Sequence, residues 1–392
     1  MPNFLLRLIW MALLSCVLCA CVREPARLDH DAYIWQRVWT PALNDALRQG
    51  TADIRQWRVL AAQTGADGAL LRFVPDWEAL AASGRPVIVV ARIDGQLRQW
   101  DEDALLAEVL DLWRDWQGHR PLVAGLEIDH DCGTARLPVY AHFLRRLKSE
   151  LDADTELSIT VLPAWLDSPA LENVLAAVDQ SVLQVHAVRD PRAGLFDGGN
   201  ARRWVEAYAR RSDKPFRVAL PNYASRASWD AEGQLADVES EAATLGGQAD
   251  ARELWSQPRQ IAEFLSILHA DPPRHLRGIA WFRLPTGNDR RAWSVATWLA
   301  VIRGQPMRDN VALDFRQSDT AGMRDLVLTN AGENDAMLPE RIGLPAACTL
   351  ADGIQGYALR READALSLRR QQPGLLRPGQ SRQVGWARCG ED

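Results

Sequence analysis

The chain has 392 residues, of which 47% are hydrophobic and 24% charged, and its formal net charge is −6. A chain of this length and apolar content can bury a large core, and its length predicts one large domain with a smaller one. The negative charge and the absence of a Lys/Arg run argue against nucleic acid as a partner.

The first twenty residues are typical of an export signal. Arg7 supplies a positive start, and the apolar run at 8–18 is shorter than a bilayer-spanning helix needs. The run ends in Leu18-Cys19-Ala20-Cys21, which resembles the bacterial lipobox. The alternative is an ordinary signal peptide cleaved near Ala20, with no role for the cysteine that follows.

The lipobox resemblance implies a signal peptide over 1–20, a lipid on Cys21 and a tether over 21–31. Acyl chains on Cys21 would hold the folded body at a lipid membrane, facing the periplasm or the cell exterior. Val22 follows the anchor cysteine, and by resemblance to other lipoproteins this favours the outer membrane.

Short β-rich runs alternate with helical patterns from residue 32 to about 304. Two helices are expected at 101–116 and 136–151, and the first opens with acids that suit a helix N-terminus. Eight β-then-α units of this total length predict a (β/α)8 barrel over 32–304, and a doubly wound open sheet is the alternative. The expected strands are 32–39, 57–63, 86–94, 123–131, 156–165, 181–188, 216–223 and 277–285.

The long segment at 224–258, after the seventh expected strand, favours a functional role over a plain connection. Beyond Gly304-Gln305-Pro306 the pattern changes to short strands separated by Gly, Pro and Asn turns. Residues 305–392 are therefore expected to form a small all-β, sandwich-like domain.

Three cysteines remain besides the signal and the anchor. Cys348 and Cys389 share the terminal segment and are natural disulfide partners in an oxidising compartment. Cys132 is then the odd thiol and is expected to be inert, although its pairing with either of the other two stays open.

The segment 125–131 carries acids at alternate positions. Strand alternation places Glu127, Asp129 and Asp131 on one face, with His130 on the opposite face toward the helices. Three carboxylates so close together cannot all stay ionised, so the pKa of at least one should rise. One acid is then protonated beside an ionised partner, as a general acid requires. Pairing with Arg92 or Arg283, or binding of a divalent cation, are the alternatives.

The segment 124–131 resembles the fourth-strand motif of family-18 glycoside hydrolases, the chitinase-like enzymes. The resemblance implies that Asp131 is the proton donor and Asp129 supports an N-acetyl group of the substrate. Leu220-Pro221-Asn222-Tyr223 and Gly278-Ile279-Ala280-Trp281 are similar to two later motifs of that family, with Trp281 one place early. The chain departs from the pattern in having Asp131 where the family has Glu, Ala124 where it has Asp, and no Tyr-Asp pair on the sixth strand.

Nearly the whole mature chain is similar to a family of bacterial lipoproteins described as domain of unknown function 3142. That resemblance brings no known activity. It rests on four segments, namely Trp35-Gln36-Arg37-Val38-Trp39, Asp129-His130-Asp131-Cys132, Leu162-Pro163-Ala164-Trp165-Leu166 and Gln184-Val185-His186.

Further polar and aromatic residues cluster at the carboxyl ends of the expected strands, where barrel enzymes place their sites. The tryptophans among them would offer flat surfaces for sugars, and the polar residues would orient the substrate. The candidates are Trp35, Trp39, Gln63, Arg92, Asp94, Trp165, Gln184, His186, Tyr223, Trp281 and Arg283.

These residues predict a membrane-anchored glycosidase-like protein that hydrolyses or handles an envelope or exported polysaccharide or oligosaccharide. Catalysis would use Asp131, with Asp129 and Glu127 setting its pKa. No cofactor and no metal are expected, since phosphate-cradling loops and zinc spacings are absent. The alternatives are a non-catalytic carbohydrate-binding or envelope-assembly lipoprotein, and a structural lipoprotein whose pocket is vestigial.

Overall fold

The computed structural model describes residues 28–390 except 66–67, 96, 98–100, 120–121, 187–193, 231–234, 240–249, 309 and 363–364. The expected signal peptide, Cys21 and most of the tether lie outside the described residues. Within the described part, no helix is long and apolar enough to cross a membrane.

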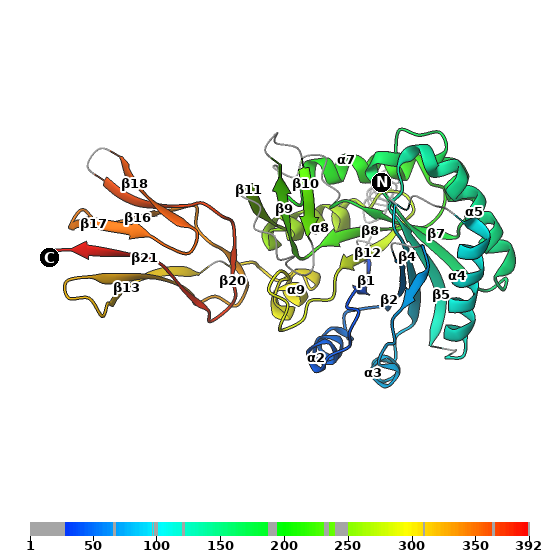
Figure 1. Cartoon of the computed structure of the whole chain (residues 1–392), viewed down its shortest axis with the longest axis horizontal. Helices are drawn as coiled ribbons and strands as arrows, with labels where there is room; N and C mark the ends of the chain where they lie inside the picture. The colour runs from blue at the N-terminus through cyan, green and yellow to red at the C-terminus, as the bar shows by residue number, and fades with distance from the viewer. Residues whose placement is uncertain are drawn as a thin grey trace, which may run out of the picture.

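Eight parallel strands close into a barrel, in which β1 pairs with both β2 and β12 (Figure 1). The closure confirms the predicted (β/α)8 barrel and excludes the open, doubly wound sheet. A short antiparallel strand, β3 (Leu70–Arg72), extends β2. The barrel strands are β1 (Asp29–Ile34), β2 (Gln56–Thr64), β4 (Val87–Ile93), β5 (Val123–His130), β6 (Glu156–Val161), β7 (Gln180–Gln184), β8 (Phe216–Pro221) and β12 (Leu276–Phe282).

Helices surround the barrel, and several begin at a side chain that accepts a hydrogen bond from the first turn. Asp101 caps α4 in this way, and Glu102 and Asp103 add the negative charge that favours a helix start. The helices are α2 (Pro41–Gly50), α3 (Trp77–Ser83), α4 (Glu102–Gln117), α5 (Leu137–Glu150), α6 (Leu171–Ala176), α7 (Gly198–Arg211), α8 (Pro258–Ala270) and α9 (Val295–Ile302), with 3-10 turns η1 (Thr134–Arg136) and η2 (Pro163–Trp165).

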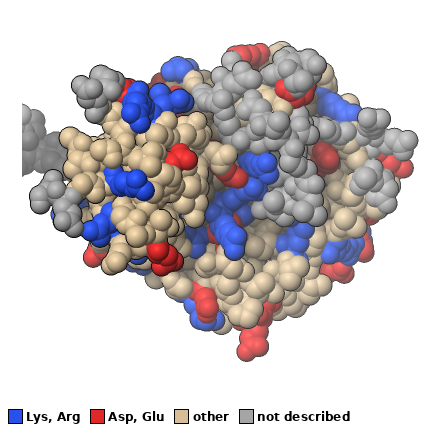
Figure 2. All heavy atoms as spheres, turned by 60° about the vertical axis from the view of Figure 1, so that its left-hand side comes forward, with Lys and Arg blue, Asp and Glu red and all other residues tan. Residues whose placement is uncertain are grey.

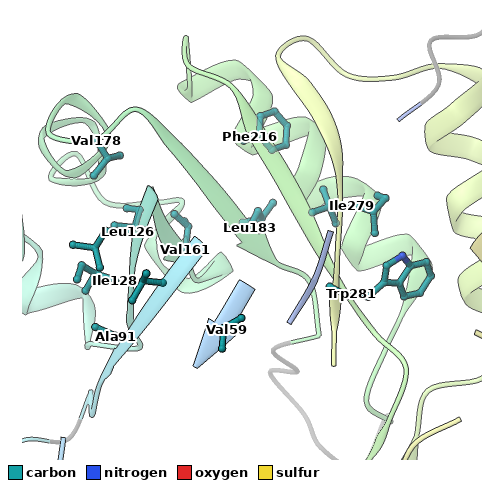
Figure 3. Packing of buried hydrophobic residues seen from close by; sticks show 14 of the residues in the cluster. Val59, Ala91, Leu126, Ile128, Val161, Val178, Leu183, Phe216, Ile279 and Trp281 are labelled. Carbon is teal, nitrogen blue, oxygen red and sulfur yellow. The ribbon is translucent and has the colours of Figure 1, made fainter. Parts of the chain in front are cut away.

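The barrel strands carry two separate sets of buried side chains. Outward-facing residues such as Leu126, Ile128 and Trp281 belong to the large cluster between strands and helices (Figure 3). Inward-facing residues such as Val90 and Ala280 form a smaller cluster inside the barrel. The two-residue period of a strand therefore decides whether a side chain reaches the helix layer or the barrel interior.

The barrel interior leaves no room for a side chain at position 278. A Cβ on Gly278 would come within 2.2 Å of Nη1 of Arg217 and 2.3 Å of the Asp29 carbonyl oxygen. Glycine at this position therefore allows the close pairing of β1 with β12 and leaves room for the buried Arg217 side chain.

Three described strands that follow β8 form an antiparallel sheet. Its central strand is β9 (Ala224–Trp229), flanked by β10 (Leu235–Glu239) and β11 (Asp250–Trp255). The described residues of the expected insertion at 224–258 thus extend the carboxyl end of the barrel.

The C-terminal region is a separate β domain with its own hydrophobic cluster, drawn in orange and red at the left of Figure 1. The predicted boundary at 304–305 falls between α9 and β13. One sheet contains β13 (Val311–Gln317), β14 (Arg324–Asn330), β21 (Ser381–Cys389) and β17 (Cys348–Gly353); a second contains β16 (Arg341–Gly343), β19 (Ala365–Arg370) and β18 (Tyr357–Glu362); β15 (Ala336–Met337) pairs with β20 (Leu375–Leu376).

Cys348 and Cys389 form a disulfide between β17 and β21, as the sequence predicted. A bridge across 41 residues stabilises the folded domain by about 4 kcal/mol on the chain-entropy model. Charged side chains of both signs are interspersed over the face shown in Figure 2, with Lys and Arg gathered near its hollowed centre.

Candidate active site

Asp129 and Asp131 lie at the carboxyl end of β5, the fourth strand of the barrel. The neighbouring strand β4 places Arg92 in register with Asp129, and Nη1 of Arg92 is 3.1 Å from Oδ2 of Asp129. Thr160 on β6 donates a 2.7 Å hydrogen bond to Oδ1 of Asp129. Gln184 on β7 donates to Asp131 at 3.1 Å and lies 3.4 Å from Asp129. Four adjacent strands therefore converge on one pair of carboxylates.

The two carboxylates differ in their access to water. The Asp129 side chain is 3% exposed, whereas that of Asp131 is 35% exposed. Partial burial, followed by the negative charge of Asp129, raises the pKa of Asp131 to about 7. Asp131 can therefore hold a proton near neutral pH and still reach a ligand.

Phe282 is the centre of an aromatic wall beside these carboxylates. Its ring centroid is 4.9 Å from Trp35, 5.6 Å from His186 and 5.5 Å from Tyr223. The Arg92 guanidinium lies 5.5 Å from the Trp35 ring centroid, which joins the wall to the carboxylate pair.

His186 and Tyr223 are the polar members of this wall. Burial lowers the pKa of His186 to about 4 and raises that of Tyr223 to about 12, so both are neutral at physiological pH. Nδ1 of His186 is buried without a hydrogen-bond partner. An unsatisfied nitrogen in this position is suited to a ligand hydroxyl or amide.

Asp94 and Gln63 lie at the rim of the same strand ends. The Asp94 side chain is exposed, and its backbone amide donates to the Thr64 hydroxyl at 2.8 Å. Gln63 accepts two hydrogen bonds from Arg37. Asp94 also contributes negative charge that raises the pKa of Asp131.

Glu127 does not belong to this exposed pair, which corrects its expected role beside Asp131. It is fully buried inside the barrel, where it pairs with Arg58 and accepts hydrogen bonds from Tyr33 at 2.7 Å and Ser158 at 2.6 Å. Two residues of rise along β5 separate it from Asp129 and take it below the reach of a ligand at the barrel mouth. Its contacts match the alternative of structural pairing with an arginine.

Three of the four tryptophans that were expected to stack on sugars pack in the cluster between strands and helices instead. Trp281 is fully buried between barrel and helices, because its place in the motif, one residue early, reverses its direction on the strand. Trp165 is fully buried and donates from Nε1 to the Cys132 carbonyl at 2.9 Å. Trp39 is half-buried against the same outer cluster. Of the four, only Trp35 joins the carboxylate site.

Arg283 was expected to bind substrate, but its side chain is 6% exposed and held by Asp289. Nη2 of Arg283 is 2.6 Å from Oδ2 of Asp289, and Nε is 3.3 Å away. The buried pair supports the end of β12 and leaves this guanidinium little surface for a sugar.

His130 and Cys132 have the structural places that the sequence predicted. His130 faces the helices, with Nδ1 3.1 Å from the Ile93 carbonyl oxygen and an edge-to-face contact with Tyr140 on α5. Cys132 is a buried free thiol, and burial raises its pKa to about 11, which keeps it unreactive.

Sequence reasoning missed Phe282 and Thr160, which both contact the site. Counting alternate positions from Gly278 along β12 would have placed Phe282 inside the barrel. Thr160 lies on the inward face of β6 beside β5, but finding it requires the strand register. Among the described residues, no group of three or more His, Cys, Asp or Glu side chains is arranged to hold a metal ion.

A cleft of about 1170 Å³ lies elsewhere, between α6, α7 and α8. Its lining includes Lys214 and His275, which precede β8 and β12. It is therefore at the amino end of the strands, opposite to Asp129 and Asp131.

The chain is a (β/α)8-barrel protein with an acidic pair at the carboxyl end of the fourth barrel strand. The model of the family described as "Domain of unknown function (DUF3142)" matches residues 83–287, and the chain belongs to this family. Residues 313–390, in the β domain, match a second family of unknown function, DUF8456. No curated protein matches the chain significantly.

Solved structures share the fold at low sequence identity. The chitinase from Chromobacterium violaceum ATCC 12472 is 15% identical, with a TM-score of 0.50, over 72% of this chain and 100% of that one. The spore cortex-lytic enzyme SleL of Bacillus cereus is 12% identical, with a TM-score of 0.52, over 71% of this chain and 75% of that one. SleL of Bacillus megaterium QM B1551 is 14% identical, with a TM-score of 0.52, over 72% and 75%.

Proposed function

We propose that this protein is an exported, lipid-anchored glycosidase that acts on an envelope or exported polysaccharide, with Asp131 as its general acid. The observation that carries the proposal is the pairing of buried Asp129 with Asp131, which is one-third exposed at the mouth of the barrel. Burial and the charge of Asp129 raise the pKa of Asp131 to about 7, which suits a general acid. The structures that share the fold are named as a chitinase and as spore cortex-lytic enzymes, which supports a polymeric glycan as the substrate.

In the proposed reaction, protonated Asp131 gives its proton to the glycosidic oxygen as the bond from that oxygen to the anomeric carbon breaks. The electron-poor sugar is captured by a nucleophile, either the substrate's own N-acetyl oxygen or water. Asp129, held by Arg92 and Thr160, lies beside the donor and would orient an N-acetyl group or stabilise developing positive charge. If the N-acetyl oxygen has attacked, water then opens that intermediate; in either route the attacking water gives up a proton, which returns to Asp131.

The aromatic wall supplies the means to hold a sugar ring. Trp35, Phe282 and Tyr223 offer apolar faces, while His186 and Gln184 offer polar atoms at the same edge. A site of this kind, apolar with a few convergent polar groups, is typical of carbohydrate recognition.

A non-catalytic carbohydrate-binding lipoprotein is the second candidate, and the contacts of Arg92 favour it. Its guanidinium lies 3.1 Å from Asp129 and 3.8 Å from Asp131, so it partly neutralises both acids. Asp131 is also one methylene shorter than the glutamate of the chitinase-like motif. Binding without hydrolysis needs only the wall and the polar rim.

The deciding experiment measures release of reducing ends from chitin oligosaccharides, peptidoglycan and exported polysaccharides. The mature protein is compared with Asp131→Asn and with Asp319→Asn, a matched change at an exposed position of the β domain. Release that is lost in Asp131→Asn and kept in Asp319→Asn supports the enzyme. Glycan binding by the wild type without any release would instead establish the binding protein.

A further inference from the structure

A guanidinium of the β domain reaches the loop that follows β12 in the barrel. Arg377 comes directly after β20, and its Nη1 donates to the Gly287 carbonyl oxygen at 3.0 Å. Its Nη2 donates to the carbonyl oxygens of Asp289 and, at 3.2 Å, Ala292. One side chain of the second domain therefore binds three carbonyl groups of a single barrel loop.

The same loop carries contacts to the candidate site. The Asp289 side chain holds Arg283, the residue that follows Phe282 at the end of β12. Ala292 forms an isolated antiparallel bridge with Tyr223, a member of the aromatic wall. Backbone hydrogen bonds flank this bridge. The Trp293 amide donates to the Asn222 carbonyl oxygen at 2.9 Å, and the Ala224 amide donates to the Arg291 carbonyl oxygen.

The turn that presents Arg377 is itself fixed. The Gln380 amide donates to the Arg377 carbonyl at 3.0 Å, and Gln380 Oε1 accepts from the Arg377 amide at 3.1 Å. The backbone amide of Gly379, whose φ is +72°, donates to the Asn330 carbonyl oxygen. The fully buried Asn330 side chain donates to the Leu376 carbonyl oxygen at the end of β20. Arg377 is thus anchored to β14 and β20 before it reaches the barrel.

A second set of hydrogen bonds joins the β domain to the barrel. Asp335 Oδ2 accepts a 2.6 Å hydrogen bond from the amide of Ser294, the cap of α9. The Asp335 amide donates to Oγ1 of Thr297 at 2.8 Å. These bonds lie directly after the loop, so both of its ends are tied, one to β12 and the other to the β domain.

From these contacts we infer that Arg377 is a positioning residue for the candidate active site. By holding the carbonyl groups of Asp289 and Ala292, it sets the position of Tyr223 and, through the Asp289–Arg283 pair, supports the end of β12 that carries Phe282. The β domain thereby becomes part of the site. The effect on glycan recognition rests on the proposed function, whereas the effect on the loop does not. A small displacement of a recognition group is sufficient to weaken a preorganised site.

The test uses the full mature chain and three variants. Arg377→Met removes all three donors and keeps much of the apolar stem, while Arg377→Lys keeps a charge that can bond to fewer carbonyls. Arg341→Met is the matched control, because Arg341 is 57% exposed and pairs with Glu362 inside the β domain. The measurements are amide hydrogen exchange at Trp293 and Ala224, and affinity for N-acetylglucosamine oligosaccharides.

In Arg377→Met we expect exchange at both amides to rise by at least about fivefold, because the bridge opens more often. Affinity should fall about tenfold, with partial rescue in Arg377→Lys and no change in Arg341→Met. Unchanged exchange in Arg377→Met would overturn the inference whatever the glycan result. Faster exchange with wild-type affinity would overturn the link to the site.

A wild-type protein that binds none of the oligosaccharides contradicts N-acetylglucosamine glycans as the substrate of the proposed function and not the inference. The exchange measurements then decide alone whether Arg377 holds the Tyr223 bridge. The two failures are therefore distinguishable.

Discussion

Nε2 of Gln184 donates a 3.1 Å hydrogen bond to Oδ1 of Asp131, so a residue of β7 reaches the acid that follows β5. This contact crosses the mouth of the barrel over β6. The amide of Gln184 donates to a carboxyl whose pKa is raised to about 7 by burial. The protonation of Asp131 therefore affects both the proposed chemistry and the stability of the fold.

Asp131→Asn should remove a pH-dependent loss of stability. The pKa of the Asp131 carboxyl is about 7 in the folded state, whereas its ordinary value is 3.8. The folded state therefore binds more protons than the unfolded state at pH values between these two. The free energy of unfolding of the wild type consequently falls as pH rises through this window and levels off above it. Urea unfolding at about pH 5 and about pH 8 should show the variant gaining on the wild type at the higher pH. A difference that is constant with pH would contradict this assignment.

Glu127→Gln should destabilise the barrel, because it leaves the fully buried Arg58 short of a counter-charge. Breaking a buried ion pair costs about 3 kcal/mol or more, measured as the change in free energy of unfolding in urea. Glu206→Gln, which removes the exposed partner of Arg202, is the control and should change stability little. If both variants changed the free energy of unfolding by the same small amount, breaking the buried Glu127–Arg58 pair would not carry this cost.

His186→Gln should make the protein less sensitive to acid. The pKa of His186 is lowered from 6.5 to about 4 by burial, so the unfolded chain binds the extra proton as pH falls between these values. The wild type should lose about 2 kcal/mol from this group at about pH 5, and nothing at about pH 8. Parallel pH profiles for the two proteins would show that His186 does not titrate in this way.

Cys21→Ser should release the protein from the membrane fraction, because the proposed acyl chains would have no attachment atom. Fractionation of cells with radiolabelled palmitate gives the readout, and Cys132→Ser, at the buried free thiol, should keep both label and membrane association. Equal labelling and equal membrane association of Cys21→Ser and the wild type would exclude the lipid anchor.

Local patterns in the chain were sufficient to predict the main architecture. Alternation of short apolar strands with helical patterns indicated the (β/α)8 barrel, because each element follows its own hydrophobic period. The Gly304-Gln305-Pro306 break indicated where the β domain begins, and proximity in the chain indicated the Cys348–Cys389 pair. The two-residue period also placed His130 toward the helices and Asp129 inside the barrel.

Tertiary structure alone decided which of these side chains share a site. Glu127 and Asp129 both face the barrel interior, but they lie at different depths. Glu127 therefore pairs with Arg58, whereas Asp129 pairs with Arg92. Phe282 and Thr160 join the carboxylates because closure brings strands into contact that are distant in sequence. Arg377 lies 85 to 90 residues beyond the loop residues that it contacts, and docking of the second domain brings it to the barrel. Such contacts depend on strand register, closure and domain docking, which no local period of the chain encodes.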